Sequence, residues 1–262
     1  MDKDKKLIFE ALENPEVLER SVSRRGALGL SGKFGAGVAL ATMPVMLAAL
    51  TRRAFAQGTL PNEIVNPLNF ALVLEYLESD FYTMGLESDG LIPDEDRAIF
   101  EQLSKHETAH VAFLSSVLGS AAAIRPQWDF TAKGAFDPFN DYPTFTLLSQ
   151  GFEDAGVRAY KGQAGNVASN DDILTAALRI HSVEARHASE VRRLRGEKGW
   201  VTLVQPNTPA ALAAVYAGEE NTTHLGIDVS GYQGADAAAE AFDEPLGLEE
   251  VLAIAGLFGT GT

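Results

Sequence analysis

Two short segments of the sequence place a histidine one helical turn after a glutamate. They are Glu107 with His110 and Glu184 with His187, both with the spacing E-x-x-H. On a helix this spacing aims a carboxylate and an imidazole at one point, as in two-metal carboxylate sites of four-helix bundles. Residues 106–110 also fit H-E-x-x-H, the zinc-protease pattern, in which His106 and His110 would both bind the metal.

An internal repeat helps to choose between these alternatives. Glu75 is followed seven residues later by Tyr82, and Glu153 is followed seven residues later by Tyr160. The offset is 78 residues for these glutamates and 77 residues for the two E-x-x-H pairs. The chain therefore resembles a duplicated helical hairpin, with one glutamate-only helix and one E-x-x-H helix in each copy.

The zinc-protease pattern does not recur in the second copy of the repeat. The residue that corresponds to His106 in the second copy is Val183, so E-x-x-H recurs and H-E-x-x-H does not. No H-x-x-G-x-x-H continuation follows His110. The repeat therefore favours a two-metal site over a zinc protease, and it makes His106, His181 and His224 surface residues or neighbours of ligands.

Apolar periodicity and capping residues predict four long helices and an all-α fold. The first two are joined by a short loop, as are the last two, whereas residues 120–142 form a long connection with several prolines and glycines. Two antiparallel pairs joined by one crossover are therefore expected. The helices are predicted from Asn66-Pro67 to Met84 before Gly85, from Pro93-Asp94 to Leu118, from Pro143-Thr144 to about Ala168, and from Asn170-Asp171 to Gly196.

Each predicted helix carries one glutamate midway along its inward stripe. Burying ionised carboxylates without partners costs several kcal/mol each, and bound divalent cations would offset that cost. Mixed oxygen and nitrogen ligands suit two iron or two manganese ions, although zinc can occupy such sites. His110 and His187 would each cap one metal, Glu107 and Glu184 would bridge the metals, and Glu75 and Glu153 would be terminal ligands.

Tyr82 and Tyr160 are the candidate catalytic residues beside these ligands. Each lies seven residues beyond a terminal glutamate on the same stripe, where a hydroxyl could bond to a ligand or gate solvent. The alternative is an amphipathic tyrosine in the bundle core. Gly156, on the third helix, would permit close approach of another helix.

The first 56 residues resemble a twin-arginine export signal. A polar leader ends in Arg24-Arg25, an apolar run extends to Leu50, and Ala54-Phe55-Ala56 fits an A-x-A cleavage site. The uninterrupted apolar run, residues 34–50, is shorter than the roughly 20 residues of a membrane span. We therefore expect removal of residues 1–56, no stable membrane anchor, and a periplasmic or secreted product.

Composition limits the chemistry and the partners. The sequence contains no cysteine, which excludes thiolate ligands and cysteine nucleophiles. Residues 57–262 contain 12 basic and 30 acidic side chains, a formal charge of −18, so a nucleic-acid partner is not expected. The expected domains are the signal (1–56), the bundle (57–196), and an extension (197–262) packed on the bundle. Outer apolar positions such as Leu74, Leu77 and Phe81 would meet this extension or the second subunit of a homodimer.

Four segments carry the candidate ligands: LNFALVLEYLESDFY, HETAHVAFL, GFEDAGVRAY and VEARHASEV. They resemble the four metal-binding helices of the ferritin-like superfamily. This resemblance implies a ferritin-like bundle with all six ligand positions present. With the C-terminal AFDEPLGLEEVLAIAGLF, the first segment is also similar to exported bacterial proteins grouped with plant desiccation-related proteins.

Three functions remain open at this stage. One is a di-iron or di-manganese enzyme that oxidises Fe(II) or reduces O2 or H2O2 in stress protection. Another is a non-catalytic desiccation protein in which metal only staples the bundle. The third is iron storage in a cage, although the extension after residue 196 is a departure from the chains of storage ferritins. Metal ions and O2 or H2O2 are the expected partners.

Overall fold

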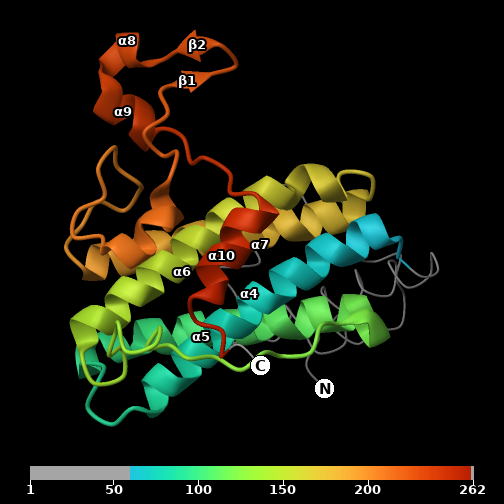
Figure 1. Ribbon diagram of the computed structural model, residues 1–262, viewed down its shortest axis with the longest axis vertical. Helices are drawn as coiled ribbons and strands as arrows, with labels where there is room; N and C mark the ends of the chain where they lie inside the picture. The colour runs from blue at the N-terminus through green and yellow to red at the C-terminus, as the bar shows by residue number, and fades with distance from the viewer. Residues whose placement is uncertain (1–59, 261–262) are drawn as a thin grey trace, which may run out of the picture. The chain divides into compact units, whose positions relative to one another are not determined.

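The computed structural model describes residues 60–260 of the chain. Within this range, α4 (Asn62–Glu87) packs against α5 (Asp94–Leu118), and α6 (Tyr142–Gln163) packs against α7 (Asp171–Leu194). The colour gradient in Figure 1 shows that the helices of each hairpin run in opposite directions, whereas α5 and α6 run the same way. This is the predicted all-α bundle with one long crossover. The predicted signal, residues 1–56, lies outside the described residues.

Helices α5, α6 and α7 begin and end close to the predicted residues. The Asn170 side chain caps α7 by accepting a hydrogen bond from Ile173 N at 3.1 Å. Helix α5 ends before Gly119, whose φ is 55°. Asp141 caps α6 by accepting from Thr144 N at 2.9 Å. These polar side chains satisfy backbone N–H groups that have no partner within the helix. After α6 the chain tightens into the 3-10 helix η3 (Ala164–Val167).

Helix α4 is longer than predicted at both ends. It begins before Pro67 because Ile64, only 1% exposed, is buried by an additional turn, and the proline costs one backbone hydrogen bond there. It also continues through Gly85, which was predicted to stop it. A Cβ at this glycine would lie 2.3 Å from a ring carbon of Phe145, so Gly85 permits the contact between α4 and α6.

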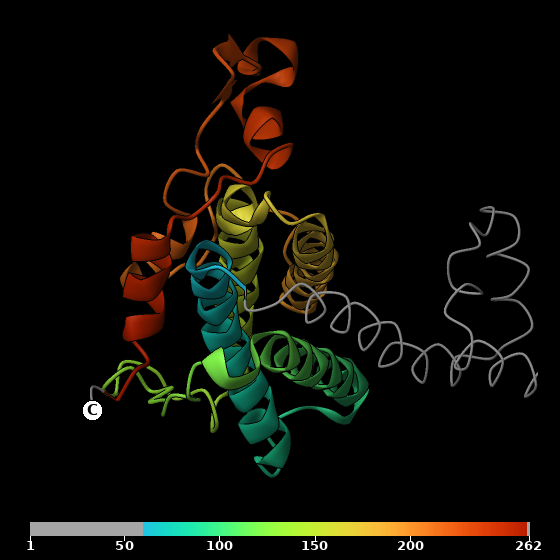
Figure 2. The same ribbon diagram turned by 90° about the vertical axis from the view of Figure 1, so that its right-hand side faces the viewer.

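The crossover, residues 119–141, begins with the 3-10 helix η2 (Gly119–Ala121) and covers the outer side of the bundle together with α10 (Leu248–Gly256). Phe81 of α4 packs on Phe130 of the crossover and on Phe152 of α6, with ring centroids 5.1 and 5.0 Å apart. Phe258 follows α10 and meets Phe152 at 4.9 Å. Figures 1 and 2 show α10 beside α6 and α4. The outer position of Phe81 is therefore covered from within this chain.

The tail after α7 contains several short elements. These are η4 (Ala210–Tyr216), the antiparallel strands β1 (Thr223–His224) and β2 (Ile227–Asp228), α8 (Ser230–Gln233), α9 (Ala235–Glu240) and α10. Gly226 (φ 79°) makes the tight turn between β1 and β2.

A buried arginine fastens the tail to α6. The Arg158 side chain, 1% exposed, donates to the carbonyl oxygens of Ala217 and Glu244 at 2.6 and 2.7 Å and also to that of Val215. Its Nε lies 2.8 Å from Oε1 of Glu219, which is also buried. Because a buried guanidinium needs these acceptors, the tail and the bundle form one packed unit here.

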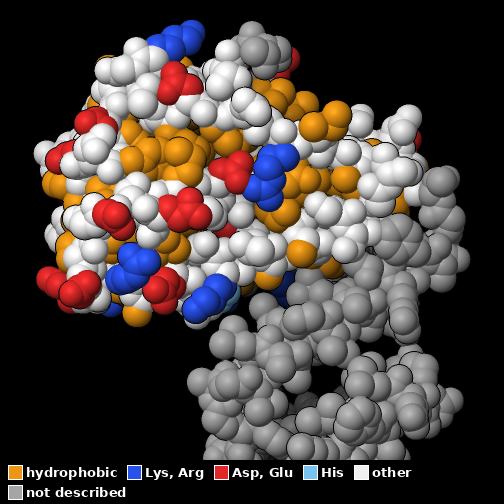
Figure 3. Space-filling view, turned by 90° about the horizontal axis from the view of Figure 1, so that it is seen from below, with side chains coloured by type: hydrophobic (Ala, Val, Ile, Leu, Met, Phe, Trp, Pro, Cys, Tyr) orange, Lys and Arg blue, Asp and Glu red, His pale blue; other side chains and the backbone are white. Residues whose placement is uncertain are grey.

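On the face shown in Figure 3, apolar side chains gather in patches between separate acidic and basic side chains. No helix within residues 60–260 is long and apolar enough to cross a membrane.

Candidate metal centre

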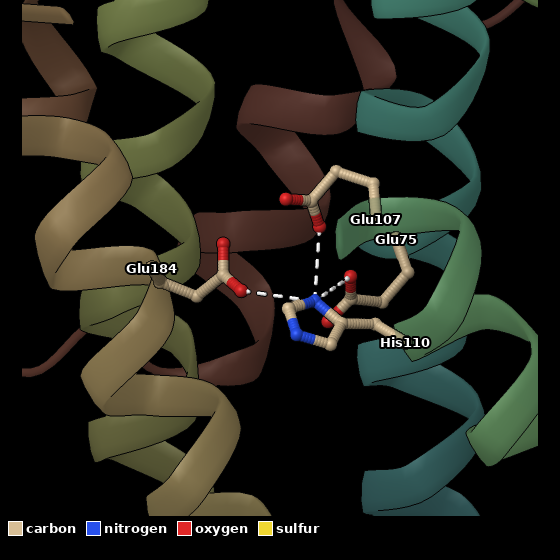
Figure 4. Close-up of side chains that lie close together, drawn as sticks. All are labelled: Glu75, Glu107, His110 and Glu184. Carbon is tan, nitrogen blue, oxygen red and sulfur yellow. Dashed lines mark hydrogen bonds and ion pairs between the residues drawn. The ribbon is translucent and has the colours of Figure 1, made fainter. Parts of the chain in front are cut away.

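Helices α4, α5 and α7 bring the first set of predicted ligands together in the core. Glu75, Glu107, His110 and Glu184 place one ligand atom each within 4.8 Å of one another, and all four residues are buried. Nδ1 of His110 lies 3.1, 3.0 and 3.2 Å from oxygens of Glu75, Glu107 and Glu184, respectively. Figure 4 shows these carboxylates converging on the imidazole from α4, α5 and α7.

A second set lies beside the first. Glu107, Glu153, Glu184 and His187 also place ligand atoms within 4.8 Å of one another. Nδ1 of His187 lies 2.9 Å from Oε1 of Glu107 and 3.2 Å from Oε2 of Glu153. Glu107 and Glu184 belong to both sets, whereas the other four residues belong to one set each. The structure thus brings the six predicted residues together in two sets that share Glu107 and Glu184.

The donor atoms fit divalent cations. Glu107 Oε1 and both carboxylate oxygens of Glu184 are buried and accept no well-aligned hydrogen bond from the described residues; the nearest donors to them are the imidazoles of His187 and His110. Leaving such oxygens without partners is costly in a core, and a cation at each set would supply them. Carboxylate oxygens with one imidazole nitrogen per set suit iron, manganese or zinc. The site can therefore bind metal.

Burial and close charges shift the pKa values in the metal-free centre. Burial raises the pKa of Glu75 to about 7, and it raises that of Glu184 well above its ordinary range together with the charges of Glu107 and Glu75. Burial alone would also raise the pKa of Glu107, but the charges of His110 and His187 bring it below its ordinary value.

Burial and the neighbouring charges act in opposite directions on the pKa values of the two histidines. Burial disfavours an imidazolium, yet the nearby carboxylates raise the pKa of His187 to about 11 and that of His110 well above its ordinary value. Protonated histidines thus neutralise part of the carboxylate charge when metal is absent. Metal binding must displace these protons, because a ligating nitrogen has to carry a free lone pair.

The two tyrosines contact the glutamates of the opposite hairpin. Tyr82 donates to Glu153 Oε1 at 2.5 Å, and Tyr160 donates to Glu75 Oε1. Sequence reasoning placed each tyrosine near the glutamate of its own helix and did not foresee this exchange. Burial and the neighbouring carboxylates raise the pKa of both phenols, so each stays protonated and acts as a donor.

His106 lies outside both sets but contacts one of them. Its Nδ1 is 2.8 Å from Nε2 of His187, the two rings stack, and Gln102 Nε2 lies 2.6 Å from its other nitrogen. Such an outer partner fixes the orientation of a ligating imidazole. Because Val183 occupies the equivalent place on α7, the two halves of the centre differ. The described histidines His181 and His224 contact Val157 O and Glu244 instead.

Glu78 is a further buried carboxylate that sequence reasoning missed. It is 3% exposed, and burial followed by the charges of Glu184 and Glu153 raises its pKa well above its ordinary value. A Cβ on Gly156 would lie 3.1 Å from Glu78 Oε1 and 3.5 Å from Glu184 Oε2, so the glycine leaves room for both carboxylates. The available signal was the three-residue spacing from Glu75, which puts Glu78 on the same face of α4.

The fold and this centre define a ferritin-like protein capable of binding metal. The family model for the ferritin-like domain matches residues 64–197, which span α4 to α7 and all residues of both sets. The chain belongs to this family. A comparison with curated proteins gives no match.

Proposed function

We propose that this protein is a di-metal oxidoreductase that holds two iron or two manganese ions and consumes O2 or H2O2. The observation that carries the proposal is the pair of buried ligand sets joined by Glu107 and Glu184. A single structural ion would need one set. Two adjacent sets with shared carboxylates suit a reaction that uses two electrons at once.

Two bound ions would supply two-electron chemistry. Together the ions would supply two electrons, so that O2 with two protons becomes H2O2, or H2O2 with two protons becomes two waters. Glu107 and Glu184 would contribute to both metal positions, and His110 and His187 would contribute to one position each. Tyr82 and Tyr160 keep a proton on each phenol oxygen and orient the terminal carboxylates. Glu78 provides another buried carboxyl group in the same core.

The proposal includes export and a protective role. Residues 1–56 resemble a twin-arginine signal, a pathway that carries folded proteins and so suits a chain that acquires metal before export. Consuming O2 or H2O2 outside the cytoplasm would protect the cell under oxidative or desiccation stress. Fractionation of cells that express the full chain, beside an Arg24→Lys, Arg25→Lys variant, tests the export; cytoplasmic retention of both would contradict it.

A structural role for the metal is the second candidate. Its support is that ligands from all four helices meet in the buried centre, so bound ions would tie both hairpins together. In that case metal removal lowers the melting temperature but no oxidant is consumed.

One experiment separates the two candidates. The protein is loaded with Fe(II) or Mn(II) without oxygen, measured amounts of O2 or H2O2 are added, and oxidant loss is followed. Our proposal predicts stoichiometric consumption by wild type and none by Glu184→Ala, which should lose at least one metal. Metal-loaded wild type that leaves both oxidants unchanged would establish the structural role instead. Glu190→Ala, an exposed change on the same helix, is the matched control.

A further inference from the structure

A small apolar hollow lies beside the metal centre. It has a volume of about 20 Å³ and lies between α4, α6, η3 and α7. This space suffices for one molecule of about the size of water. Its lining includes Ala71, Leu74, Ala159, Tyr160, Val167 and Ala177.

The hollow ends at a residue of the centre. Tyr160, which lines it, donates its hydroxyl hydrogen bond to Glu75 in the first ligand set. Leu74, another lining residue, directly precedes Glu75 in α4. Tyr160 therefore belongs both to the lining of the hollow and to the hydrogen-bonded surroundings of the first ligand set.

A larger and more polar hollow adjoins the first. It measures about 290 Å³, shares Pro67 and Gln163 with the apolar hollow, and is lined by the exposed residues Glu63, Asn66 and Asn166. Gln163 is half-buried and supplies a polar group where the two hollows meet. The two hollows are therefore neighbours, with Pro67 and Gln163 in the lining of both.

The lining selects among small molecules by their need for hydrogen bonds. Apart from Gln163 at this junction and the Tyr160 hydroxyl already bonded to Glu75, the lining residues have apolar side chains. Water and H2O2 would give up hydrogen bonds to bulk solvent on entering, which costs free energy. O2 is apolar and of suitable size, and it loses no such bonds.

We propose that this hollow is a dioxygen subsite, through which O2 rather than H2O2 approaches the Glu75 side of the centre. The inference rests on the proposed function, because it assigns the oxidant that the centre uses. It also makes a separate statement about binding: O2 should enter the hollow whether or not a redox metal is present.

Nuclear magnetic resonance under oxygen pressure tests the binding directly. O2 is paramagnetic and broadens nearby methyl signals. The full chain is used with zinc in place of a redox metal, or as isolated if it binds no metal. The Ala71 methyl should broaden more than that of Ala188, which is similarly buried but lies outside the hollow. Equal broadening of the two methyls would overturn the subsite even if the oxidase activity is real.

A filled hollow provides the second test. Ala177→Leu adds three carbon atoms to the lining, and Ala185→Leu makes the same change at an exposed position of α7. We expect Ala177→Leu alone to abolish the additional broadening of Ala71 and to slow oxidation by O2 but not by H2O2. Broadening that persists in Ala177→Leu, or equal slowing with both oxidants, would contradict the proposal. If Ala177→Leu does not fold, the wild-type comparison of Ala71 with Ala188 still decides.

Discussion

Tyr82 of α4 donates a hydrogen bond of 2.5 Å to Glu153 of α6, so a side chain of one hairpin orients a ligand of the other. Tyr160 of α6 reciprocates by donating to Glu75 of α4. Each terminal carboxylate therefore depends on both copies of the repeat. This crossed arrangement makes the assembly of the two hairpins a condition for a complete centre.

Removal of either crossed hydroxyl should destabilise the bundle. Tyr82→Phe and Tyr160→Phe each leave a buried carboxylate oxygen without its donor, which costs about 1–3 kcal/mol. Urea unfolding of the metal-free protein measures this loss. Tyr76→Phe, on the helix of Tyr82, is the control, because the Tyr76 hydroxyl makes only long contacts of 3.4 and 3.5 Å. A loss in Tyr76→Phe as large as in the other two variants would refute a special role for the crossed pair.

His106 should affect one half of the centre more than the other. Replacing it by the residue of the second copy, His106→Val, removes the contact to Nε2 of His187 and should weaken metal binding there by roughly 10–100-fold. The set around His110 should keep its affinity. Calorimetric titration with Mn(II) resolves the two binding steps. Equal weakening of both steps, or no change in either, would show that His106 does not orient His187.

The metal-free protein should lose stability as the pH rises. The pKa of His187 is raised from 6.5 to about 11, so its contribution is fully present below pH 6.5 and is lost as pH rises towards 11. The pKa of Glu75 is raised from 4.5 to about 7, so its contribution to stability is likewise lost as the pH rises through that range. The lowered pKa of Glu107 has an effect only below pH 4.5.

Scanning calorimetry of the chelated protein from pH 6.5 to 9.5 checks this expectation. The melting temperature should fall with pH in wild type and should fall less in His187→Gln. A melting temperature that rises over this range would contradict the protonated state assigned to His187. Saturating metal should weaken the decline, because metal replaces the protons.

Arg158 should be required for attachment of the tail. Arg158→Met leaves Glu219 buried without its cation, which costs about 3–5 kcal/mol. The additional change Glu219→Leu should recover much of this loss by removing the unpaired charge. Urea unfolding measures the stability, and limited proteolysis reports on release of residues 210–244. An Arg158→Met variant as stable and protease-resistant as wild type would refute the anchoring role.

The sequence allowed much of the bundle to be predicted because its signals are local. Asn170 before α7 and Gly119 after α5 act within one helical turn, and the E-x-x-H spacing needs only helical geometry. Pro67 and Gly85 were misread because packing outweighed their local tendencies: Ile64 is buried by an added turn, and Gly85 faces Phe145.

Contacts between elements were harder to foresee. The stripe pattern placed Tyr82 and Tyr160 in the core but could not show which glutamate each would meet, because that depends on how α4 and α6 approach one another. Glu78 was missed since its burial depends on the space beside Gly156, a residue on another helix. Arg158 depends on tail carbonyl groups 57 to 86 residues further along the chain.

Metal content per chain tests the central claim most directly. The mature protein is compared by plasma mass spectrometry with the double variant Glu107→Ala, Glu184→Ala, which removes both shared carboxylates. Glu101→Ala, Glu190→Ala is the control, with exposed or partly exposed glutamates on the same two helices. We predict about two iron or manganese ions per chain in wild type and control, and loss of both in the double variant. A folded wild-type protein that contains no metal and cannot be reconstituted would contradict the account.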